Sequence, residues 1–133
     1  MKPTLHILTN PNAITHTRYR MDPFNVAALK FIANMKSRGW NMIHYGHESA
    51  EVDCENVVCI TDSELPPPEN GNLFLHRPEL LPIYNERASA AIAKIKQPGD
   101  MILSFYGLAN KQTCDDHSDL KIVEPSIGYP PET

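Results

Sequence analysis

His47 and Glu48 are the adjacent residues of this chain whose types best suit acid–base chemistry. They follow a short apolar run, and an imidazole or a carboxylate at the end of a strand can take the proton of a substrate hydroxyl group. Neighbouring residues of an extended chain point to opposite sides, so the two need not act together. The alternative is that they anchor or solvate a loop, as most polar loop residues do. We treat His47 and Glu48 as the candidate catalytic residues.

Further candidates lie in other segments that follow apolar runs. The long polar segment after the first run contains Asn10 and His16, with arginines nearby that can pair with a phosphate. The alternative for that segment is a solvated polar loop. Tyr106 and Gly107 follow a later run. Glu124 precedes a proline that favours extended backbone, and it could grip a hydroxyl group or structure a domain junction. These five residues are candidate substrate contacts.

The other reactive residue types do not form a recognisable metal or redox site. The segment 115–119 contains three aspartates and a histidine without the spacing of a known ligand set, so we expect a solvated acidic turn and no metal. The three cysteines lack a CxxC pair, which favours free thiols in a reducing compartment.

The remaining histidines are expected to be structural or solvent-exposed. His6 and His44 lie inside apolar runs, so we expect them in the core or the sheet, with their ring nitrogens hydrogen-bonded. His76 and His117 lie in polar segments, so we expect both on the surface.

Hydrophobic periodicity predicts the elements that must position the candidate residues. Apolar runs bounded by breakers predict five strands, at 5–8, 40–45, 57–60, 101–106 and 121–123. Asp22-Pro23 predicts the start of a helix that ends at Gly39, and helical spacing recurs at 81–95. A short polar helix is expected within 108–119, and the proline-rich segment 62–78 is expected to be a surface loop.

The alternation of these strands and helices predicts an α/β fold. We expect a Rossmann-like, open, mainly parallel five-stranded sheet in the order 3-2-1-4-5, with helices on both faces. Ligands of such sheets bind at the carboxyl ends of the strands, which the candidate residues follow. The first loop contains no glycine, so the GxGxxG turn of a classical dinucleotide site is missing, and no P-loop, HExxH or GxSxG motif occurs.

Length and charge narrow the class of protein. With 133 residues, the chain has room for one compact domain, which we expect to span residues 1–133. Its 12 Lys and Arg against 16 Asp and Glu give a net charge of −4, which argues against nucleic-acid binding. No run reaches the roughly 18 apolar residues of a membrane span, and the first residues lack the apolar region of a signal peptide. We therefore expect a cytoplasmic protein.

Three segments together resemble the N-terminal half of a bacterial and viral glycosyltransferase family of GT-B type. They are 43–48 (IHYGHE), 99–100 (GD) and 123–129 (VEPSIGY). In that family the strand after the first helix reads HYGxE and the half closes with VEPGIGY, so Ser126 stands here where the family has glycine. The segments occur in the family's order, and the resemblance runs from Leu5 to Pro130.

The resemblance implies an acceptor-side domain of a two-domain enzyme. A sugar would pass from a nucleotide-sugar donor to a small-molecule or glycan acceptor in the cleft between the domains, without an obligatory cofactor or metal. The donor would bind to a C-terminal domain or a partner subunit that this chain does not include, so we expect no transfer by this chain alone. The residues that the resemblance places at the cleft are Gly46, His47, Glu48, Glu124, Gly128 and Tyr129.

Two other interpretations remain open. The chain could be a small nucleoside- or nucleotide-processing enzyme of flavodoxin-like fold, with Glu48 or Glu124 as the nucleophile in N-glycosidic bond cleavage. It could also be a non-catalytic module that keeps the fold and binds a small ligand or a protein.

Overall fold

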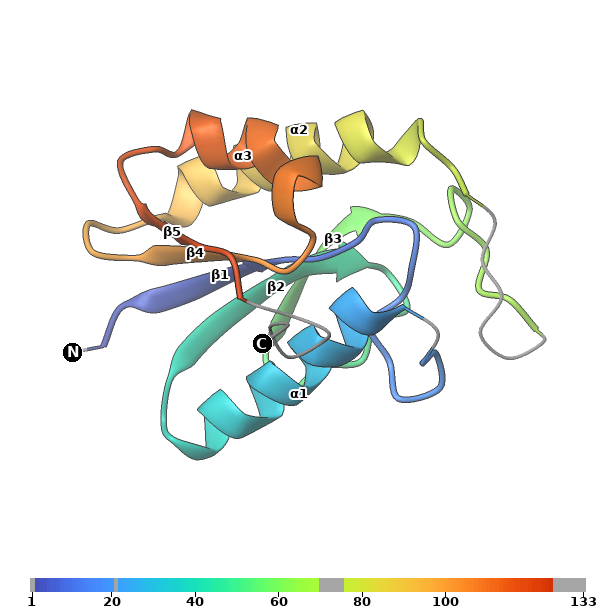
Figure 1. The fold of residues 1–133 in the computed structure, drawn as a ribbon, viewed down its shortest axis with the longest axis horizontal. Helices are drawn as coiled ribbons and strands as arrows, with labels where there is room; N and C mark the ends of the chain where they lie inside the picture. The colour runs from blue at the N-terminus through green and yellow to red at the C-terminus, as the bar shows by residue number, and fades with distance from the viewer. Residues whose placement is uncertain (1, 21, 70–75, 126–133) are drawn as a thin grey trace, which may run out of the picture.

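The core of the molecule is an entirely parallel sheet with the strand order β3-β2-β1-β4-β5 (Figure 1). The computed structural model describes residues 2–20, 22–69 and 76–125. The strands are β1 (Thr4–Leu8), β2 (Asn41–His47), β3 (Glu55–Ile60), β4 (Met101–Ser104) and β5 (Lys121–Val123). The predicted α/β, Rossmann-like fold and its strand order are confirmed.

Two strands end at other residues than predicted. β2 continues to His47, because His47 still pairs with Ile60 after a register shift that follows Gly46. β4 ends at Ser104, and Phe105 only donates its backbone N–H to the Leu8 carbonyl as the chain turns away. His47 therefore belongs to the sheet itself rather than to the loop that follows it.

Helix α1 (Pro23–Ser37) covers one face of the sheet. Asp22 is its N-cap, because the Asp22 carboxylate accepts a hydrogen bond from the Asn25 backbone N–H, and Pro23 fixes the first helical φ. The helix ends where Gly39 adopts a φ of 81°, a conformation that favours glycine. The predicted start and end of this helix are confirmed.

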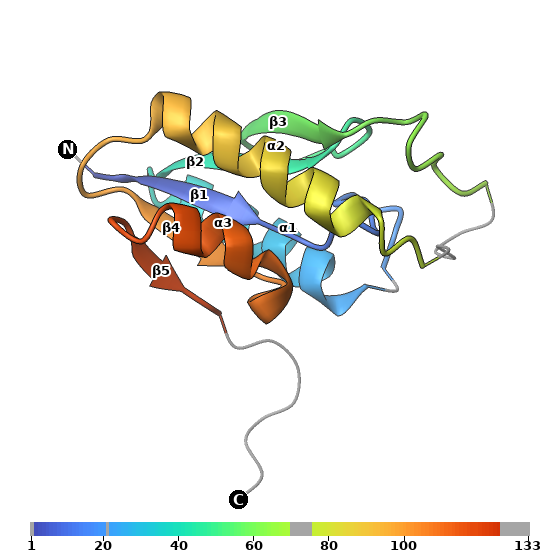
Figure 2. The same cartoon turned by 90° about the horizontal axis from the view of Figure 1, so that it is seen from above.

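Helix α2 (Leu80–Ile95) and the shorter α3 (Lys111–Asp116) lie side by side on the opposite face (Figure 2). A 3₁₀ turn, η1 (Gly107–Asn110), connects β4 to α3. The chain therefore leaves β1 towards the α1 face and leaves β4 towards the α2 face. This divergence makes the carboxyl ends of β1 and β4 the topological switch point of the sheet.

Two hydrophobic cores lie on opposite faces of the sheet, because alternate side chains of each strand point to opposite sides. The core beside α1 contains Leu5, Ile7, Ala28, Ile32, Met42, Leu103 and Phe105. The core beside α2 contains Leu8, Tyr45, Cys59, Ile60, Leu65, Leu80, Tyr84, Ala88, Ile92, Ile102 and Leu120. None of the three cysteines is in a disulfide. Within the described residues, no helix has the length and apolar character to cross a membrane.

A buried polar network links β1, β2 and the residue that precedes β4. His6 lies 2.7 Å from the Tyr45 hydroxyl through Nδ1 and 2.9 Å from the Asp100 carboxylate through Nε2. Burial opposes ionisation of Asp100, but hydrogen bonds from His6 and from the backbone N–H groups of Gln97 and Thr4 outweigh it, so the pKa of Asp100 is lowered. His6 is therefore a satisfied core histidine, as predicted.

The prediction that His117 lies on the surface is wrong. His117 is only 3% exposed, because α3 packs against α2 and turns this ring inward. Its Nε2 lies 2.9 Å from the Ser89 carbonyl, which only an N–H can satisfy, and its Nδ1 accepts from the Lys96 ammonium at 3.0 Å. The prediction failed because the neighbouring aspartates indicate an exposed segment, whereas the His117 side chain itself points into the core. His76 is exposed, as predicted.

Candidate functional site

The HYGHE segment (44–48) consists of the last four residues of β2 and Glu48, and its first histidine is buried. His44 Nδ1 lies 2.7 Å from Asn56 Oδ1, and Nε2 lies 2.9 Å from the Thr15 hydroxyl. The Asn56 amide also donates to the His47 carbonyl, so its oxygen faces His44, which must carry the proton on Nδ1. Burial lowers the pKa of His44 to about 4. His44 is thus a neutral anchor for the first loop.

Gly46 lies directly beneath the His44 ring. A Cβ at Gly46 would stand 2.3 Å from His44 Cε1, which no real pair of atoms tolerates. Residue 46 must therefore be glycine as long as the His44 ring occupies this position. Gly46 is itself buried, and its close approach is to His44 rather than to an open face.

His47 is 2% exposed, and both of its ring nitrogens are occupied. Nε2 donates to the Leu65 carbonyl at 2.7 Å, and Nδ1 accepts from the Ser49 backbone N–H at 2.9 Å. A neutral imidazole has one donor and one acceptor nitrogen, so this arrangement uses both. In this conformation, His47 anchors the loop after β3 and has no nitrogen left for a substrate hydroxyl.

Glu48 is exposed at the carboxyl edge of the sheet. Its Oε1 accepts the Asp62 backbone N–H at 2.8 Å, while Oε2 has no hydrogen bond within the described ranges. The carboxylate is thereby held in place with one oxygen still able to accept a proton. Of the two candidate catalytic residues, only Glu48 keeps a side-chain atom without a hydrogen bond to the described part of the chain.

Glu124 lies at the same edge of the sheet as His47 and Glu48, but not beside them. It follows β5, and the strand order puts three strand spacings between β2 and β5, about 14 Å at roughly 4.8 Å each. Glu124 is exposed, and its negative charge contributes to the raised pKa of Cys114, after burial of the thiol. A retaining nucleophile needs a buried carboxylate facing the ligand, and neither Glu124 nor Glu48 is buried.

His16 is held by one contact within the first loop and one with the segment after β2. Its Nε2 lies 3.1 Å from the Glu51 carboxylate, and its Nδ1 accepts from the Arg18 backbone N–H. The Glu51 backbone N–H in turn donates to the Thr15 carbonyl. His16 therefore joins the first loop to the segment after β2.

Asn10 and Asp22 meet at the switch point, where β1 leads into α1. The Asn10 amide donates to Asp22 Oδ1 at 3.3 Å, and Asp22 Oδ2 accepts the Asn25 backbone N–H at 3.0 Å. Burial raises the pKa of Asp22, although the hydrogen bonds from Asn25, Asn10 and Phe24 act in the opposite direction. No cation lies within ion-pairing distance of Asp22 in the described part of the chain.

Tyr106 and Gly107 reach the switch point from β4. The Tyr106 ring packs edge-to-face on Phe24 with centroids 5.0 Å apart, and burial together with the negative charge of Asp22 raises the pKa of Tyr106. The Tyr106 hydroxyl has no hydrogen-bond partner among residues 2–20, 22–69 and 76–125. Gly107 has a φ of 59°, and a Cβ there would meet nothing within 4 Å.

Asn110 approaches the same place from η1. It is fully buried, its amide donates to the Thr9 carbonyl at 3.3 Å, and its Oδ1 has no partner in the described structure. A buried oxygen without a donor is costly, and because this atom is enclosed by the protein, an enclosed water would be the partner that satisfies it. We define the switch-point cluster as Asn10, Asp22, Tyr106 and Asn110.

The sequence pointed to half of this cluster. Asn10 and Tyr106 follow strands and were predicted as substrate contacts. The sequence predicted Asp22 only as the N-cap of a helix. A carboxylate N-cap on the helix that follows the first strand is nevertheless a sequence feature that can indicate a site. Asn110 also lies in the segment after the fourth strand, but its position beside β1 depends on how η1 folds back. Gly128 and Tyr129 lie outside the described residues.

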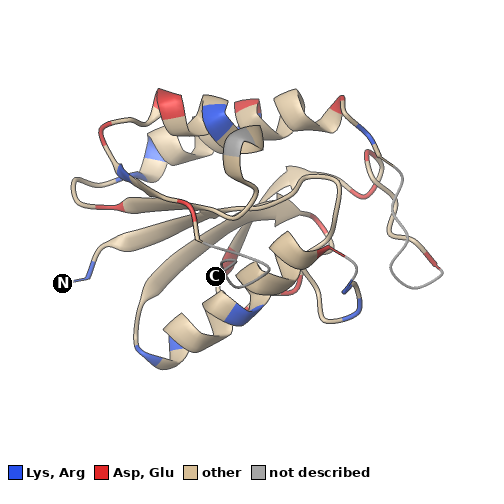
Figure 3. Ribbon diagram, in the orientation of Figure 1, with Lys and Arg blue, Asp and Glu red and all other residues tan. Residues whose placement is uncertain are grey.

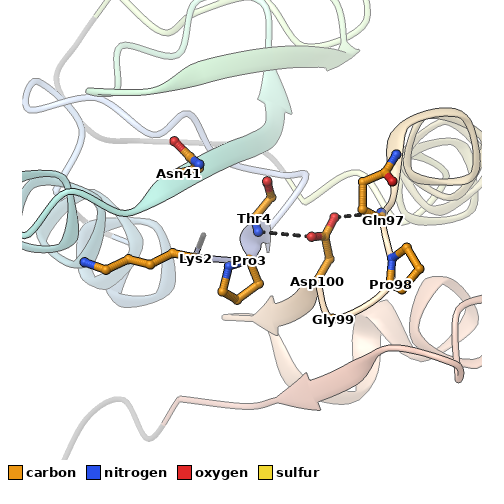
Figure 4. A pocket seen from close by; sticks show the side chains of 8 residues that line it. All are labelled: Lys2, Pro3, Thr4, Asn41, Gln97, Pro98, Gly99 and Asp100. Atoms are coloured by element: carbon orange, nitrogen blue, oxygen red, sulfur yellow. Dashed lines mark hydrogen bonds between the residues drawn. The ribbon is translucent and has the colours of Figure 1, made fainter.

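A hollow of about 340 Å³ lies at the opposite, amino edge of the sheet (Figure 4). Lys2, Thr4, Asn41, Gln97 and Asp100 are among its lining residues. Both Asp100 oxygens are occupied by His6 and by the backbone N–H groups of Thr4 and Gln97, as the dashed lines in Figure 4 partly show. Because its carboxylate is already satisfied and parallel sheets bind ligands at the other edge, we favour the switch-point cluster.

Charged residues of both signs are interspersed over the elements of the fold (Figure 3). No group of three or more metal-ligating side chains occurs among the described residues. Comparison of the chain with protein-family models, with curated proteins and with solved structures finds no match.

Proposed function

We propose that the chain is the acceptor-side half of a GT-B-type glycosyltransferase. The order of the three motif segments supports the proposal, together with a Rossmann-like parallel sheet of the expected topology. The observation that carries it is the switch-point cluster, a group of polar side chains at the carboxyl edge in which Asp22 has no ion-pair partner among the described residues. Such a group suits the hydroxyl groups of an acceptor better than a diphosphate. The nucleotide-sugar donor then belongs to a second domain, on the same or another polypeptide.

In this proposal, an acceptor hydroxyl oxygen attacks the anomeric carbon of the donor sugar. The bond from that carbon to the nucleoside diphosphate breaks, and its electron pair leaves with the diphosphate. Glu48 takes the hydroxyl proton through Oε2, while Oε1 stays on the Asp62 N–H. His47 holds the segment after β3 in place through the Leu65 carbonyl. Glu124, at the carboxyl end of β5, is assigned to the side that faces the donor domain.

The test looks for a donor-binding Rossmann-like domain encoded next to this chain and pairs the two, fused or as separate polypeptides. A panel of labelled nucleotide sugars and glycan acceptors is offered to the chain, to the partner and to both. We expect transfer only with both, and we expect Glu48→Gln to lower kcat by roughly a hundredfold or more. Glu55→Gln, an exposed glutamate at the start of β3, is the matched control and should leave kcat unchanged.

Two outcomes would contradict this proposal. Sugar transfer by the chain without any donor-binding domain would refute the division of labour between two domains. Full activity of Glu48→Gln would show that Glu48 is not the base that takes the hydroxyl proton. If no combination transfers sugar while the chain forms a stable complex with the partner, a non-catalytic interaction module becomes the better interpretation.

A further inference from the structure

Strand β3 is the edge strand at the opposite side of the sheet from β5 (Figure 2). Alternate N–H and C=O groups of a strand point away from its neighbour, so an edge strand offers them to another chain. Arg87 of α2 already binds one of them, the Cys59 carbonyl, at 2.8 Å. Between Asn56 and Val58, the backbone has no hydrogen bonds to the described residues beyond its pairing with β2. This part of the edge can therefore accept a further strand.

The two edge strands differ in the features that prevent pairing with another chain. β5 has only three residues and begins with Lys121, and a short edge strand with a lysine resists pairing. β3 has six residues and contains neither lysine nor proline. Val58 of β3 is 47% exposed, because the Val57 side chain packs towards α2 and Val58 points to the other face. An apolar side chain of an added strand can pack beside Val58.

The part of the chain that contains β3 is strongly acidic. The sequence has no Lys or Arg between Arg38 and Arg77, whereas carboxylates occur at Glu48, Glu51, Asp53, Glu55, Asp62, Glu64 and Glu69. Asp53 and Glu55 are exposed at the amino end of β3, and Asp62 follows its carboxyl end. Of these carboxylates, only Glu64 pairs with a lysine or arginine in the described structure. An added strand would therefore meet negative charge at both of its ends.

This charge disfavours a second copy of the chain as the added strand. In a parallel pair of β3 strands, the carboxylates of Asp53 and Glu55 would face their own copies. In an antiparallel pair, they would approach Asp62 of the other chain. Like charges opposite each other on paired strands are destabilising. A strand with lysine or arginine near its ends and an apolar residue at its centre has the complementary pattern.

We propose that the outer edge of β3 binds an extended, basic segment of another protein, which adds a strand to the sheet. The backbone between Asn56 and Val58 supplies the hydrogen bonds, and the Val58 side chain packs against an apolar residue of the segment. The carboxylates at the two ends of β3 select lysine or arginine over acidic residues. This surface does not depend on the proposed sugar transfer.

The test is a titration of the ¹⁵N-labelled chain with the synthetic peptide acetyl-Lys-Thr-Val-Lys-Val-Thr-Lys-amide, followed by amide chemical shifts. We expect saturable shifts centred on residues 55–58, with a Kd of about 0.1–1 mM because the paired stretch is short. An increase in salt from about 20 mM to about 200 mM should weaken binding at least about threefold, since the charges involved are exposed. A peptide with glutamate in place of each lysine should give no saturable shifts at these residues.

A second peptide separates strand pairing from attraction between charges. It has the same sequence with N-methyl groups on its three central residues, so it retains the side chains and the charge but lacks the central N–H donors. We expect it to bind at least about tenfold more weakly. Equal binding of the two peptides would overturn the proposal, because charge alone would then bring the peptide to this surface.

Val58→Lys should weaken binding of the lysine peptide at least about fivefold, because it replaces the apolar contact with a charge of the same sign as the peptide. Ile95→Lys is the matched control, since Ile95 is also an exposed large hydrophobic residue, 39% exposed, but lies in α2. It should bind the peptide as the native chain does. Circular dichroism should show both variants folded, and unchanged binding by folded Val58→Lys would contradict the proposal.

The contribution of charge is tested with two double variants. Asp53→Asn with Glu55→Gln should weaken binding about three- to tenfold and reduce its dependence on salt. Asp115→Asn with Asp119→Asn removes the same charge from exposed positions in α3 and in the loop before β5, and should change binding little. Absence of saturable shifts at residues 55–58 with the lysine peptide would overturn the proposal. Dimerisation of the native chain through these residues would also overturn it, because a second copy would then occupy the edge.

Discussion

At the scale of single residues, the HYGHE segment is explained by contacts within the chain. His44 joins the first loop to β3, Gly46 leaves room for the His44 ring, and His47 binds the loop after β3. These contacts fix the positions of the loops at the carboxyl edge of the sheet, whichever ligand binds there. Only Glu48 presents a free oxygen to the outside of this segment.

Replacement of Gly46 by alanine should destabilise the protein by about 1–3 kcal/mol, because the new Cβ forces the buried His44 ring out of place. Urea unfolding measures this difference. In a His44→Ala background the same replacement should cost much less, since the clashing ring is gone. Equal costs in both backgrounds would show that something other than the His44 ring excludes a side chain there.

His44 should also make stability depend on pH. Its pKa is about 4 in the folded chain, against a usual 6.5, so between these values the unfolded chain binds a proton that the folded chain does not. Stability from this group is present above pH 6.5 and falls as the pH drops towards 4. Between pH 7 and pH 5, the native chain should lose about 2 kcal/mol more than His44→Gln does. Parallel losses in urea unfolding at the two pH values would contradict this.

At the scale of elements, the Tyr84 hydroxyl of α2 forms hydrogen bonds with the backbone of β2 and with the backbone residue that follows β1. The Tyr84 hydroxyl donates to the Tyr45 carbonyl at 2.6 Å and accepts the Thr9 backbone N–H at 2.9 Å. Thr9 is the first residue after β1. The contact therefore connects α2, on one face of the sheet, to the carboxyl end of β1 at the switch point. The helical spacing of Tyr84 predicted a buried face but not this contact.

Tyr84→Phe should therefore cost about 1–3 kcal/mol, because it leaves the buried Thr9 N–H without its acceptor. Faster hydrogen exchange at the Thr9 amide should accompany the loss of stability. Tyr106→Phe removes a hydroxyl that has no partner in the described structure, so it is the matched control and should change stability little. A Thr9 amide that remains as protected as before would argue against the coupling.

At the scale of the whole molecule, β3 is an edge strand of the sheet formed by the described residues. The Ile60 carbonyl accepts the Glu48 N–H on the side of β2, and successive carbonyls of a strand alternate, so the Cys59 carbonyl points outward. Arg87 of α2 donates to that carbonyl at 2.8 Å and also pairs with Glu64, whose pKa this hydrogen bond lowers to about 2. Arg87 thus covers part of an edge that could otherwise pair with another chain.

Arg87→Met should increase self-association, because it uncovers the Cys59 carbonyl on an edge strand that contains no lysine or proline. Light scattering coupled to size-exclusion chromatography, over a series of protein concentrations, measures the effect. Lys94→Met makes the same change of charge on the exposed side of α2 and should behave as the native chain does. If both variants associate equally, loss of charge rather than the uncovered edge is responsible.

The sequence by itself determined the order and type of the elements, since apolar period, caps and breakers are local signals. Asp22-Pro23 and Gly39 marked α1, and the parallel sheet put the candidate residues at one edge. Only the tertiary structure decided which of them come together. Side-chain partners such as Leu65 for His47 and Thr9 for Asn110 lie 18 and 101 residues away along the chain, and no local pattern encodes such distances. Three-dimensional packing therefore turned His47 into an anchor, separated Glu124 from Glu48, and gathered the switch-point cluster around β1 and β4.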